Sequence, residues 1–302
     1  MREEKLRAGK FPVDAALVRR LLAAQFPHWA DLPVRPVDRD GWDNWTFHLG
    51  ERMKVRLPSA EGYAAQAAKE ATWLPRLAPH LPLPVPMPLA VGTPNEDFPW
   101  HWSVYDWLAG EPANAARVAD RVGFARDLAA FVKALQATGT SGGPAPGQHS
   151  FFRGAHPVRV YGDEARRAVA ALGSQIDASA ALKLLDDAAR TEWTAAPVWS
   201  HGDIALGNLL VRDGRLAAVI DFGCASVGDP ACDLVIAWLF LEGESRAAFR
   251  AGLELDEGTW VRARAWALWK AAIVAAAGSV SNPDEASPLA VIAAVLDEHA
   301  AG

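Results

Sequence analysis

The stretch SHGDIALGNLLVRDGRLAAVIDFG, residues 200–223, sets three polar side chains around two apolar runs. The three are Asp203, Asn208 and Asp221. An Asp-Gly pair separates the apolar runs, and this pair is a strong signal for a β-hairpin with a two-residue turn. We therefore expect two short antiparallel strands, with the polar side chains at their outer ends.

The register of this hairpin follows from its turn. If Arg212 pairs with Arg215, then Asn208 lies opposite Val219. Side chains alternate with a period of two along a strand, so Asp221 shares a face with Val219 and therefore with Asn208. Asn208 and Asp221 become diagonal neighbours, roughly 7–8 Å apart at Cα. A cation between them could bind both.

Oxygen ligands of this kind suit a hard cation, and magnesium is typically held by one or two side chains together with substrate phosphates. Asp203 precedes the first strand in a loop and is close enough in sequence to reach the same region. A carboxylate that accepts a hydroxyl proton beside metal ligands is the arrangement that phosphoryl transfer requires. The alternative is that all three residues are turn formers flanking a hairpin.

The motif D-x4-N followed by D-F-G is the catalytic-loop and metal-loop pair of protein-kinase-like folds. The form HGDIALGN…VIDFG…GDPACDL resembles the aminoglycoside phosphotransferases and related small-molecule kinases, with matching features from about residue 40 to 240. The resemblance implies an α+β, bilobal protein-kinase-like fold, with a small β-rich N-terminal lobe and a larger helical C-terminal lobe. It implies that Asp203 is the catalytic base, that His201 supports the loop, and that Asn208 and Asp221 bind Mg²⁺.

The pattern along the chain supports two lobes. The first third predicts helices over residues 14–26 and 61–77 and a hairpin between them, whereas residues 114–137 begin a helix-rich remainder. The proline-dense segment 78–94 predicts an extended connector. We place the boundary so that residues 1–107 form a nucleotide-binding lobe and residues 108–302 a catalytic and substrate-binding lobe.

The resemblance also assigns nucleotide-binding residues in the first lobe. The first lobe lacks the motif G-x-G-x-x-G of protein kinases. The family tends to use a shorter polar loop instead, which makes Asp43 and Asn44 candidates near the phosphates of ATP or GTP. Their alternative role is that of ordinary turn residues. Where the family usually has lysine, this chain has Arg56, which can make forked contacts to phosphate. Lys54, on the same strand face, is the fallback, and Glu70 matches the acidic partner of the cation.

The stretch SVYDWLAGE, residues 103–111, resembles the hinge between the lobes. The resemblance implies that backbone groups near Asp106 and Leu108 bind the base. The tryptophans around this stretch could equally serve packing, which is the commoner role of that residue.

Three departures from protein kinases favour a small-molecule acceptor. Protein kinases have lysine two residues after the catalytic aspartate, and this chain has Ala205. Only CASV separates DFG from GDPACDL, which leaves no room for an activation segment or a peptide platform. We expect Asp229 and Asp233 of GDPACDL to be structural, either by bracing the catalytic loop or by starting the next helix.

The acceptor itself is open at this stage. Ammonium groups of an aminoglycoside could bind a carboxylate-lined surface, although a solvated helix end explains these acids better: Glu242, Glu244, Glu254, Asp256 and Glu257. An apolar pocket for a macrolide could be lined by tryptophans, for which core packing is the favoured role: Trp238, Trp260, Trp266 and Trp269. A macrolide or metabolite kinase of the same fold is therefore an alternative.

The composition of the chain limits the classes of partner that we expect it to bind. The chain has 302 residues with a net charge of −6, which argues against non-specific binding to nucleic acid or an anionic membrane. The apolar segment from Trp260 to Val280 contains three basic residues, so we expect a buried amphipathic helix rather than a membrane span. No signal-peptide pattern opens the chain, so we expect a cytoplasmic location. We expect Cys224 and Cys232 to be reduced and buried.

Two further classes of protein compete with a kinase. A nucleotide-binding pseudokinase that acts as a regulatory module would lack one of the three polar residues, and its only support is the arginine at position 56. A metal-dependent hydrolase that uses the carboxylates alone leaves the β-rich first lobe and the hinge-like stretch unexplained. The oligomeric state is not constrained by the sequence.

Overall fold

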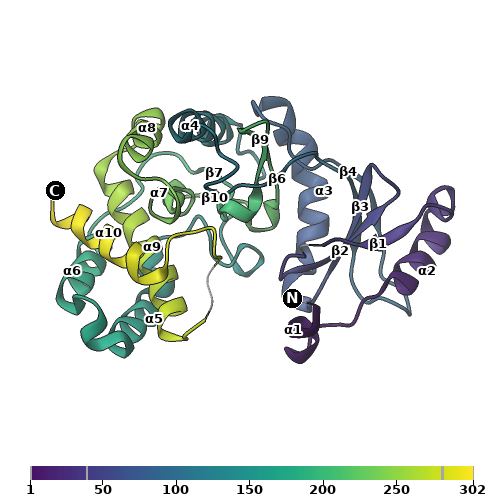
Figure 1. Cartoon of the computed structure of the whole chain (residues 1–302), viewed down its shortest axis with the longest axis horizontal. Helices are drawn as coiled ribbons and strands as arrows, with labels where there is room; N and C mark the ends of the chain where they lie inside the picture. Colours follow the sequence, from purple (N-terminus) through teal and green to yellow (C-terminus); the bar gives the residue numbers. More distant parts are fainter. Residues whose placement is uncertain (1, 39, 280–281, 302) are drawn as a thin grey trace. The chain divides into compact units, whose positions relative to one another are not determined.

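The computed structural model describes residues 2–38, 40–279 and 282–301, and Figure 1 labels their helices and strands. These residues divide into two units. Unit 1 holds the described residues of 1–79, 84–109 and 221–223. Unit 2 holds those of 80–83, 110–220 and 224–302. The triplet 221–223 thus clusters with the N-terminal residues although both of its flanks belong to unit 2.

Unit 1 is built on an antiparallel five-stranded sheet in the order β1-β2-β3-β5-β4. Its strands are β1 Val34–Pro36, β2 Asn44–Leu49, β3 Met53–Pro58, β4 Pro88–Gly92 and β5 Trp102–Asp106. Its helices are α1 Arg2–Arg7, α2 Ala15–Gln25 and α3 Ala65–Leu77. The sheet and α2 share one apolar core.

The predicted hairpin is the centre of this sheet. Strands β2 and β3 pair from Leu49 opposite Met53 outward, around a turn whose Gly50 has a φ of 61°. Trp45, Phe47 and Leu49 are fully buried in the core. Because side chains alternate along a strand, the opposite face of β3 carries Lys54 and Arg56, both of them buried.

The predicted helices of unit 1 are present, and two of its strands, β1 and β4, were not predicted. Asp14 caps α2 by accepting a hydrogen bond of 2.7 Å from the N–H of Leu17. The segment 78–94, expected to be a connector only, contains β4 at the edge of the sheet. An edge strand tolerates proline because one row of its backbone groups needs no partner strand.

Unit 2 is mainly helical. Its helices are α4 Arg121–Ala137, α5 Pro157–Leu172, α6 Ala178–Ala189, α7 Ile236–Leu239, α8 Gly243–Leu253, α9 Glu257–Ala276 and α10 Pro288–Ala300. Its strands are β6 Glu111–Pro112, β7 Val198–Ser200, β8 Leu209–Arg212, β9 Arg215–Val219 and β10 Ser226–Gly228. Helix α9 packs against α5, α6 and α10 (Figure 1).

The helix predicted over residues 114–137 begins later than expected. Asp120 accepts hydrogen bonds from the N–H groups of Val122 and Gly123, so this aspartate is the N-cap and α4 starts at Arg121. The residues before it follow β6 through a turn in which Asn114 accepts from the N–H of Arg117. Side-chain caps, which the apolar periodicity does not contain, set this boundary.

Helix α9 is the segment predicted to be a buried amphipathic helix, and it is buried on most of its surface. Arg262 and Arg264 are 0% and 2% exposed. Arg262 pairs with Asp229 at 2.6 Å, and Arg264 pairs with Glu298 at 3.1 Å. Val280, the predicted end of the segment, lies outside the described residues.

Across the described ranges, every helix is too short or too polar to cross a bilayer. The expected reduced thiols are present: Cys224 is half-buried and Cys232 is buried.

Replacing Arg262 should destabilise unit 2. Arg262→Met would leave the Asp229 carboxylate buried without its cation, which costs about 3 to 5 kcal/mol when one partner of a buried pair is removed. We expect a clear fall in the midpoint of thermal unfolding followed by circular dichroism. The control is Arg7→Met, because Arg7 and its partner Glu3 are 75% and 84% exposed and should contribute nothing measurable. Equal midpoints for the two variants would contradict this assignment.

Candidate active site

The loop of residues 201–208 follows β7 in unit 2 and ends in a short 3-10 turn, Leu206–Asn208. The side-chain amide of Asn208 donates two hydrogen bonds of 3.0 Å to Asp203, one to its backbone carbonyl and one to its carboxylate Oδ2. The same amide therefore fixes both the path of the loop and the direction of the carboxylate. Two of the three polar residues that the sequence singles out are in contact.

His201 is fully buried and acts through both ring nitrogens. Its Nδ1 accepts the N–H of Asp203 at 3.2 Å, and its Nε2 lies 3.0 Å from the carbonyl oxygen of Ile220. Since Nδ1 accepts, Nε2 carries the proton and donates to Ile220. The ring thus ties the loop to the last residue before Asp221, which is a positioning role.

Asp233 holds the loop by its backbone. Its carboxylate is 0% exposed and accepts the N–H groups of His201 at 2.8 Å and Gly202 at 2.7 Å. Burial raises the pKa of Asp233, while the His201 side chain and the two N–H donors act in the opposite direction. Asp229 instead caps the turn that follows it through the N–H of Ala231. Both aspartates therefore have the structural roles that we expected.

Gly202 is required by its surroundings. Its φ is +85°, in the left-handed region. A Cβ atom at this position would lie 2.6 Å from the carbonyl oxygen of Cys224 and 2.9 Å from the Cβ of Arg153. Only glycine fits this backbone path without strain.

The hairpin forms, but its predicted register is wrong by one residue at the open end. Arg212 pairs with Arg215 as assumed, around a turn in which both central residues have positive φ. A shift between Leu210 and Val211 then places Leu209, not Asn208, opposite Val219. The extra residue on β9 is a β-bulge, which bends a strand and changes which side chains share a face. The shared-face argument for Asn208 and Asp221 therefore fails.

Asn208 instead pairs through its backbone with the residue before Asp221. Its carbonyl oxygen accepts the N–H of Ile220 at 2.9 Å. Asp221 itself lies beyond the end of β9 with a φ of 68°, a left-handed conformation that is uncommon outside glycine. A strained backbone at a chemically important carboxylate is the kind of feature that clusters at functional sites.

In unit 1, Arg56 joins two carboxylates. Its guanidinium lies 3.2 Å from Glu70 on α3 and 3.0 Å from Asp221. The Tyr105 hydroxyl on β5 also donates to Glu70. Burial acts to lower the pKa of Arg56, but the charges of Asp221 and Glu70 hold it well above its ordinary value. Arg56, and not the fallback Lys54, is therefore the partner of Glu70.

The polar loop before β2 is tied to α3. The Asn44 side-chain amide donates to Gln66 at 3.1 Å, and Gln66 donates to Asp43 at 3.1 Å. Asn44 is buried and Asp43 is half-buried. In this arrangement both residues connect the start of β2 to α3, which is neither the phosphate contact nor the ordinary turn role that we considered from the sequence.

The hinge-like stretch begins at the end of β5. The N–H of Asp106 donates to Met87 at 3.3 Å, and the N–H of Trp107 donates to Arg52 at 2.8 Å. Asp106 is exposed and Leu108 is half-buried. The chain is therefore hydrogen-bonded, where it leaves the sheet, to the residues that immediately precede β4 and β3.

The two predicted Mg²⁺ ligands fit a hard cation by their chemistry. Asn208 turns its nitrogen toward Asp203, so that its amide oxygen remains as a ligand atom. Asp221 contributes a carboxylate with a side chain that is 33% exposed. Carboxylate and amide oxygens are the ligands that Mg²⁺ accepts, together with phosphate oxygens and water. No cluster of three or more acidic, histidine or cysteine side chains among the described residues forms an alternative metal site.

Comparison with known proteins now decides the family. A match to the phosphotransferase enzyme family covers residues 33–268. The chain belongs to this family. The resemblance drawn from HGDIALGN, IDFG and GDP is thereby confirmed.

Individual relatives agree with this membership. Aminoglycoside 3'-phosphotransferase from Escherichia coli is 35% identical over an alignment that covers 18% of this chain and 26% of the relative. The chain thus matches about a quarter of the length of that curated relative. The structure of wild-type aminoglycoside 2'-phosphotransferase-IIIa in its GDP complex is similar, with a TM-score of 0.68 and 17% identity over 96% of this chain and 99% of that chain.

A second solved structure widens the set. Macrolide 2'-phosphotransferase MphH from Brachybacterium faecium, as the apoenzyme, has a TM-score of 0.53 and 25% identity over 96% of this chain and 90% of that chain. These likenesses show a kinase-like fold, in which an N-terminal antiparallel sheet is followed by a mainly helical region. The predicted α+β, protein-kinase-like fold is confirmed.

Most of the acidic residues that we considered for binding an aminoglycoside form ion pairs or cap a helix within the chain. Glu242 pairs with Arg121 at 2.5 Å, Glu254 pairs with Lys133, and Glu257 pairs with arginines. Asp256 caps α9. Their carboxylates are used by helix ends and surface ion pairs, as we favoured from the sequence.

The tryptophans proposed for an apolar pocket are core residues, also as favoured. Trp238, Trp260, Trp266 and Trp269 are between 1% and 7% exposed. Trp269 stacks on Tyr161 at a centroid distance of 4.1 Å and donates its indole N–H to Glu164. Trp238 also donates its indole N–H, to Glu298 at 3.0 Å, whereas the buried indole N–H groups of Trp260 and Trp266 have no partner among the described residues. Packing accounts for these tryptophans.

The sequence missed Glu285. This residue lines a cavity of about 380 Å³ in unit 2, together with Arg121, Trp238, Arg246 and Asp284 among others. The carboxylate of Glu285 accepts the N–H of Leu206 at 3.3 Å, so one residue that lines the cavity contacts the loop that holds Asp203. Burial raises the pKa of Glu285, and the nearby charge of Lys270 opposes that effect. No motif marks this glutamate, because its contact joins segments about 80 residues apart.

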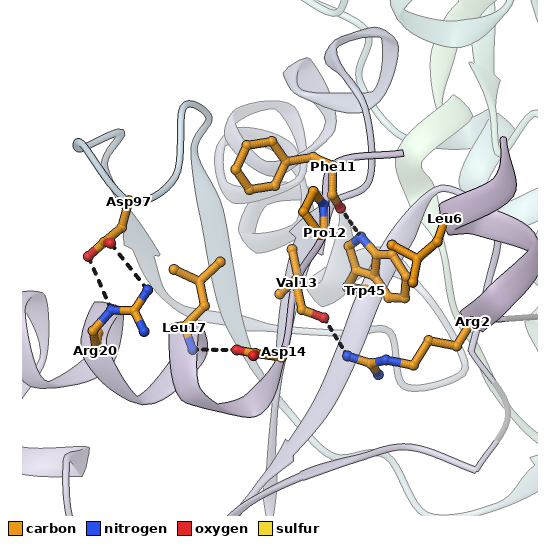
Figure 2. Close-up of a pocket in the computed structure, with 10 residues that line it drawn as sticks. All are labelled: Arg2, Leu6, Phe11, Pro12, Val13, Asp14, Leu17, Arg20, Trp45 and Asp97. Atoms are coloured by element: carbon orange, nitrogen blue, oxygen red, sulfur yellow. Dashed lines mark hydrogen bonds and ion pairs between the residues drawn. The ribbon is translucent and has the colours of Figure 1, made fainter. Parts of the chain in front are cut away.

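A cavity of about 420 Å³ in unit 1 is unrelated to the predicted site (Figure 2). Its polar groups bind one another: Arg20 pairs with Asp97 at 3.2 Å, and the Trp45 indole donates to Phe11 at 2.8 Å. None of the catalytic, metal or nucleotide residues expected from the sequence lines it. It lies between residues of α1, the start of α2 and β2, and we assign no role to it.

Two glycines of the loop provide a matched test of its geometry. Gly202→Ala should disturb the loop and abolish activity, because the new Cβ would clash with Cys224 and sit on a left-handed backbone that costs about 1–3 kcal/mol. Gly207→Ala is the control, because a Cβ there meets nothing within 4 Å. Thermal unfolding and phosphotransfer assays of both variants would check this. A Gly202→Ala enzyme that matches Gly207→Ala would show that the loop is not so constrained.

Proposed function

We propose that the chain transfers the γ-phosphoryl group of ATP or GTP to a hydroxyl group of a small molecule, with Mg²⁺. The observation that carries this proposal is the contact between Asp203 and Asn208, in a loop that Asp233 and His201 hold by its backbone. A carboxylate aimed by an amide, in a member of the phosphotransferase enzyme family, is suited to proton transfer at a reacting hydroxyl.

In the proposed reaction, the hydroxyl oxygen of the acceptor forms a bond to the γ-phosphorus. The bond between that phosphorus and the oxygen bridging to the β-phosphate breaks, and the diphosphate leaves with the electron pair. The hydroxyl proton goes to the Asp203 carboxylate and from there to solvent. The amide of Asn208 keeps Oδ2 of Asp203 in one orientation, so little is left to reorganise as the reaction proceeds.

We assign nucleotide binding to unit 1. Arg56 binds phosphate oxygens while Glu70 holds its guanidinium in place. Asp43 and Asn44 shape the loop near the phosphates, and the backbone around Asp106 and Leu108 binds the purine. Solved structures of the same fold support a nucleotide cosubstrate, since they include complexes with GDP, ATP and ADP.

Asn208 and Asp221 are the proposed Mg²⁺ ligands. When bound, the metal ion neutralises negative charge on the phosphate oxygens during transfer. Asn208 supplies an amide oxygen and Asp221 a carboxylate, and Arg56 holds Asp221 at 3.0 Å from its guanidinium.

The acceptor is proposed to be an aminoglycoside-like antibiotic, or a related hydroxylated compound such as a macrolide. The cavity that includes Glu285 has a volume within the ordinary range of small-molecule sites. Similar folds occur in a streptomycin–ATP complex and in macrolide phosphotransferases. Asp284 and Glu285 offer acceptors for ammonium or hydroxyl groups, and Trp238 offers an apolar wall.

Asp203→Asn tests the proposed base. Asparagine keeps the shape but cannot take the proton, so turnover should fall at least about 100-fold while nucleotide binding stays intact. The measurement is ADP release in the presence of ATP, Mg²⁺ and a panel of aminoglycosides and macrolides, with calorimetric ADP binding alongside. Asp213→Asn is the matched control, since Asp213 is exposed at the hairpin turn, where asparagine tolerates its positive φ. Wild-type turnover in Asp203→Asn would rule out the role.

Asp221→Ala tests metal ligation. ADP with Mg²⁺ should raise the thermal midpoint of the wild-type chain more than ADP with EDTA does, because ligands stabilise the state that binds them. In Asp221→Ala this Mg²⁺-dependent increment should disappear, while the shift in EDTA remains. An increment of unchanged size would count against Asp221 as a ligand.

A further inference from the structure

Lys54 is a buried ammonium group on the same sheet face as Arg56. It is 8% exposed, and in the register of the sheet it lies opposite His48 on β2 and Tyr105 on β5. Its Nζ lies 5.9 Å from the centroid of the Tyr105 ring, and the Arg56 guanidinium lies 5.8 Å from the same centroid. The two cations therefore flank one aromatic ring.

The two cations differ in their partners. Arg56 is paired with both Glu70 and Asp221. Within the described residues, the Lys54 side chain makes no hydrogen bond or ion pair, and its Nζ lies 5.9 Å from the centroid of the Tyr105 ring. The Nζ is not among the side-chain atoms that are closed off from water without a partner. A buried charge without a hydrogen-bonded partner is costly, so it is rare unless something else supplies the partner.

The cost at Lys54 is visible in its protonation. Burial, and next the positive charge of Arg56, lower the pKa of Lys54 to about 8, although Glu70 and Asp221 oppose the shift. Near neutral pH the fold therefore holds a proton on Lys54 at the expense of stability. Such a local conflict is expected where a residue serves function rather than folding.

We propose that Lys54 is a second nucleotide-binding cation, whose ammonium group binds a phosphate of the nucleotide that Arg56 also holds. This rests on the proposed function, because it assumes that a nucleotide occupies the face of unit 1 that carries Arg56. A phosphate is favoured over the purine because the phosphate carries full negative charge that attracts the ammonium group, whereas the purine is neutral.

The proposal has a protonic consequence. A phosphate beside Lys54 stabilises its charged form, so nucleotide binding above pH 8 must take up a proton. The affinity is then constant below about pH 8 and falls as the pH rises, by about tenfold at pH 9. The affinity loss stops once the pH exceeds the pKa that Lys54 has in the complex.

The neighbouring groups do not produce the same signal. Burial lowers the pKa of His48, so its ring is neutral across pH 7–9. Burial and the charge of Glu70 raise the pKa of Tyr105 well above its ordinary value. Arg56 stays charged, because Asp221 and Glu70 hold its pKa well above the ordinary value.

The experiment measures ADP and adenosine binding by calorimetry between pH 7 and 9.5, with Mg²⁺, for the wild type, Lys54→Met and Lys54→Arg. At pH 8.5, two buffers of different ionisation enthalpy report proton uptake. We expect the wild type to lose about tenfold in ADP affinity by pH 9 and to take up protons. Lys54→Met should bind ADP at least tenfold more weakly at pH 7, with no such loss. Lys54→Arg should bind without the pH-dependent loss, since arginine stays charged.

Additional measurements distinguish a wrong assignment of Lys54 from a wrong proposed function. Lys133→Met, at an exposed lysine of unit 2, should match the wild type. Adenosine affinity should be equal in the wild type and Lys54→Met; an equal loss for adenosine and ADP would place the contact on the base and overturn the proposal. Unchanged ADP affinity and proton uptake in Lys54→Met would also overturn it, with the proposed function intact. If the wild type binds neither ADP nor GDP, the proposed function itself fails.

The folding of the variant is a built-in check. In the unfolded chain Lys54 has an ordinary pKa near 10.5, so the unfolded state binds more protons than the folded state between pH 8 and 10.5. The stability contributed by this site therefore rises with pH in that window and is lowest below pH 8. Lys54→Met should accordingly unfold at a higher temperature than the wild type at pH 7, and this advantage should shrink by pH 10. A thermal midpoint below the wild-type value at pH 7 would contradict the absence of a stabilising partner.

Discussion

The geometry of the candidate active site depends on one buried carboxylate. Asp233 accepts the N–H groups of both His201 and Gly202, and it is closed off from water. These two hydrogen bonds offset the burial of the carboxylate, so the two donors cannot move away without a large penalty. Once they are fixed, the left-handed path at Gly202 and the contact of the His201 ring with Asp203 follow. The carboxylate of Asp203 is thus aimed by contacts made to the backbone before it.

The sequence identified the elements of this site better than their contacts. The Asp-Gly turn, the paired strands and the loop ahead of them follow from local chemistry, and the structure contains all three. The bulge opposite Leu210 and Val211 has no glycine or other local marker, and it shifts Asn208 away from its predicted partner. The alternation of side chains along a strand does not reveal where an extra residue is inserted. Asn208 and Asp203 were grouped correctly by spacing, but only the fold shows that they touch.

Local sequence patterns do not predict ion pairs between residues that are far apart in the sequence. Three basic residues in a largely apolar segment predict an amphipathic helix, yet α9 buries Arg262 and Arg264 completely or nearly so. Their partners, Asp229 and Glu298, stand more than 30 residues away. The same applies to Glu285, whose contact with the loop of residues 201–208 joins distant segments. Helical periodicity predicts which residues share a face, and tertiary partners decide whether a charged face is solvated or buried.

Arg56 and Lys54, the two buried cations on one face of β3, differ in character, and this difference suits the nucleotide binding that we propose. Arg56 cannot lose its proton, and its forked guanidinium is suited to holding Glu70 and Asp221 together before any ligand binds. That commitment offsets much of its positive charge. Lys54 has the opposite character. Its ammonium group is compact, its side chain is unpaired among the described residues, and burial lowers its pKa to about 8. A site with one fixed and one titratable cation can keep its acidic residues ordered when empty and still present positive charge to an arriving phosphate.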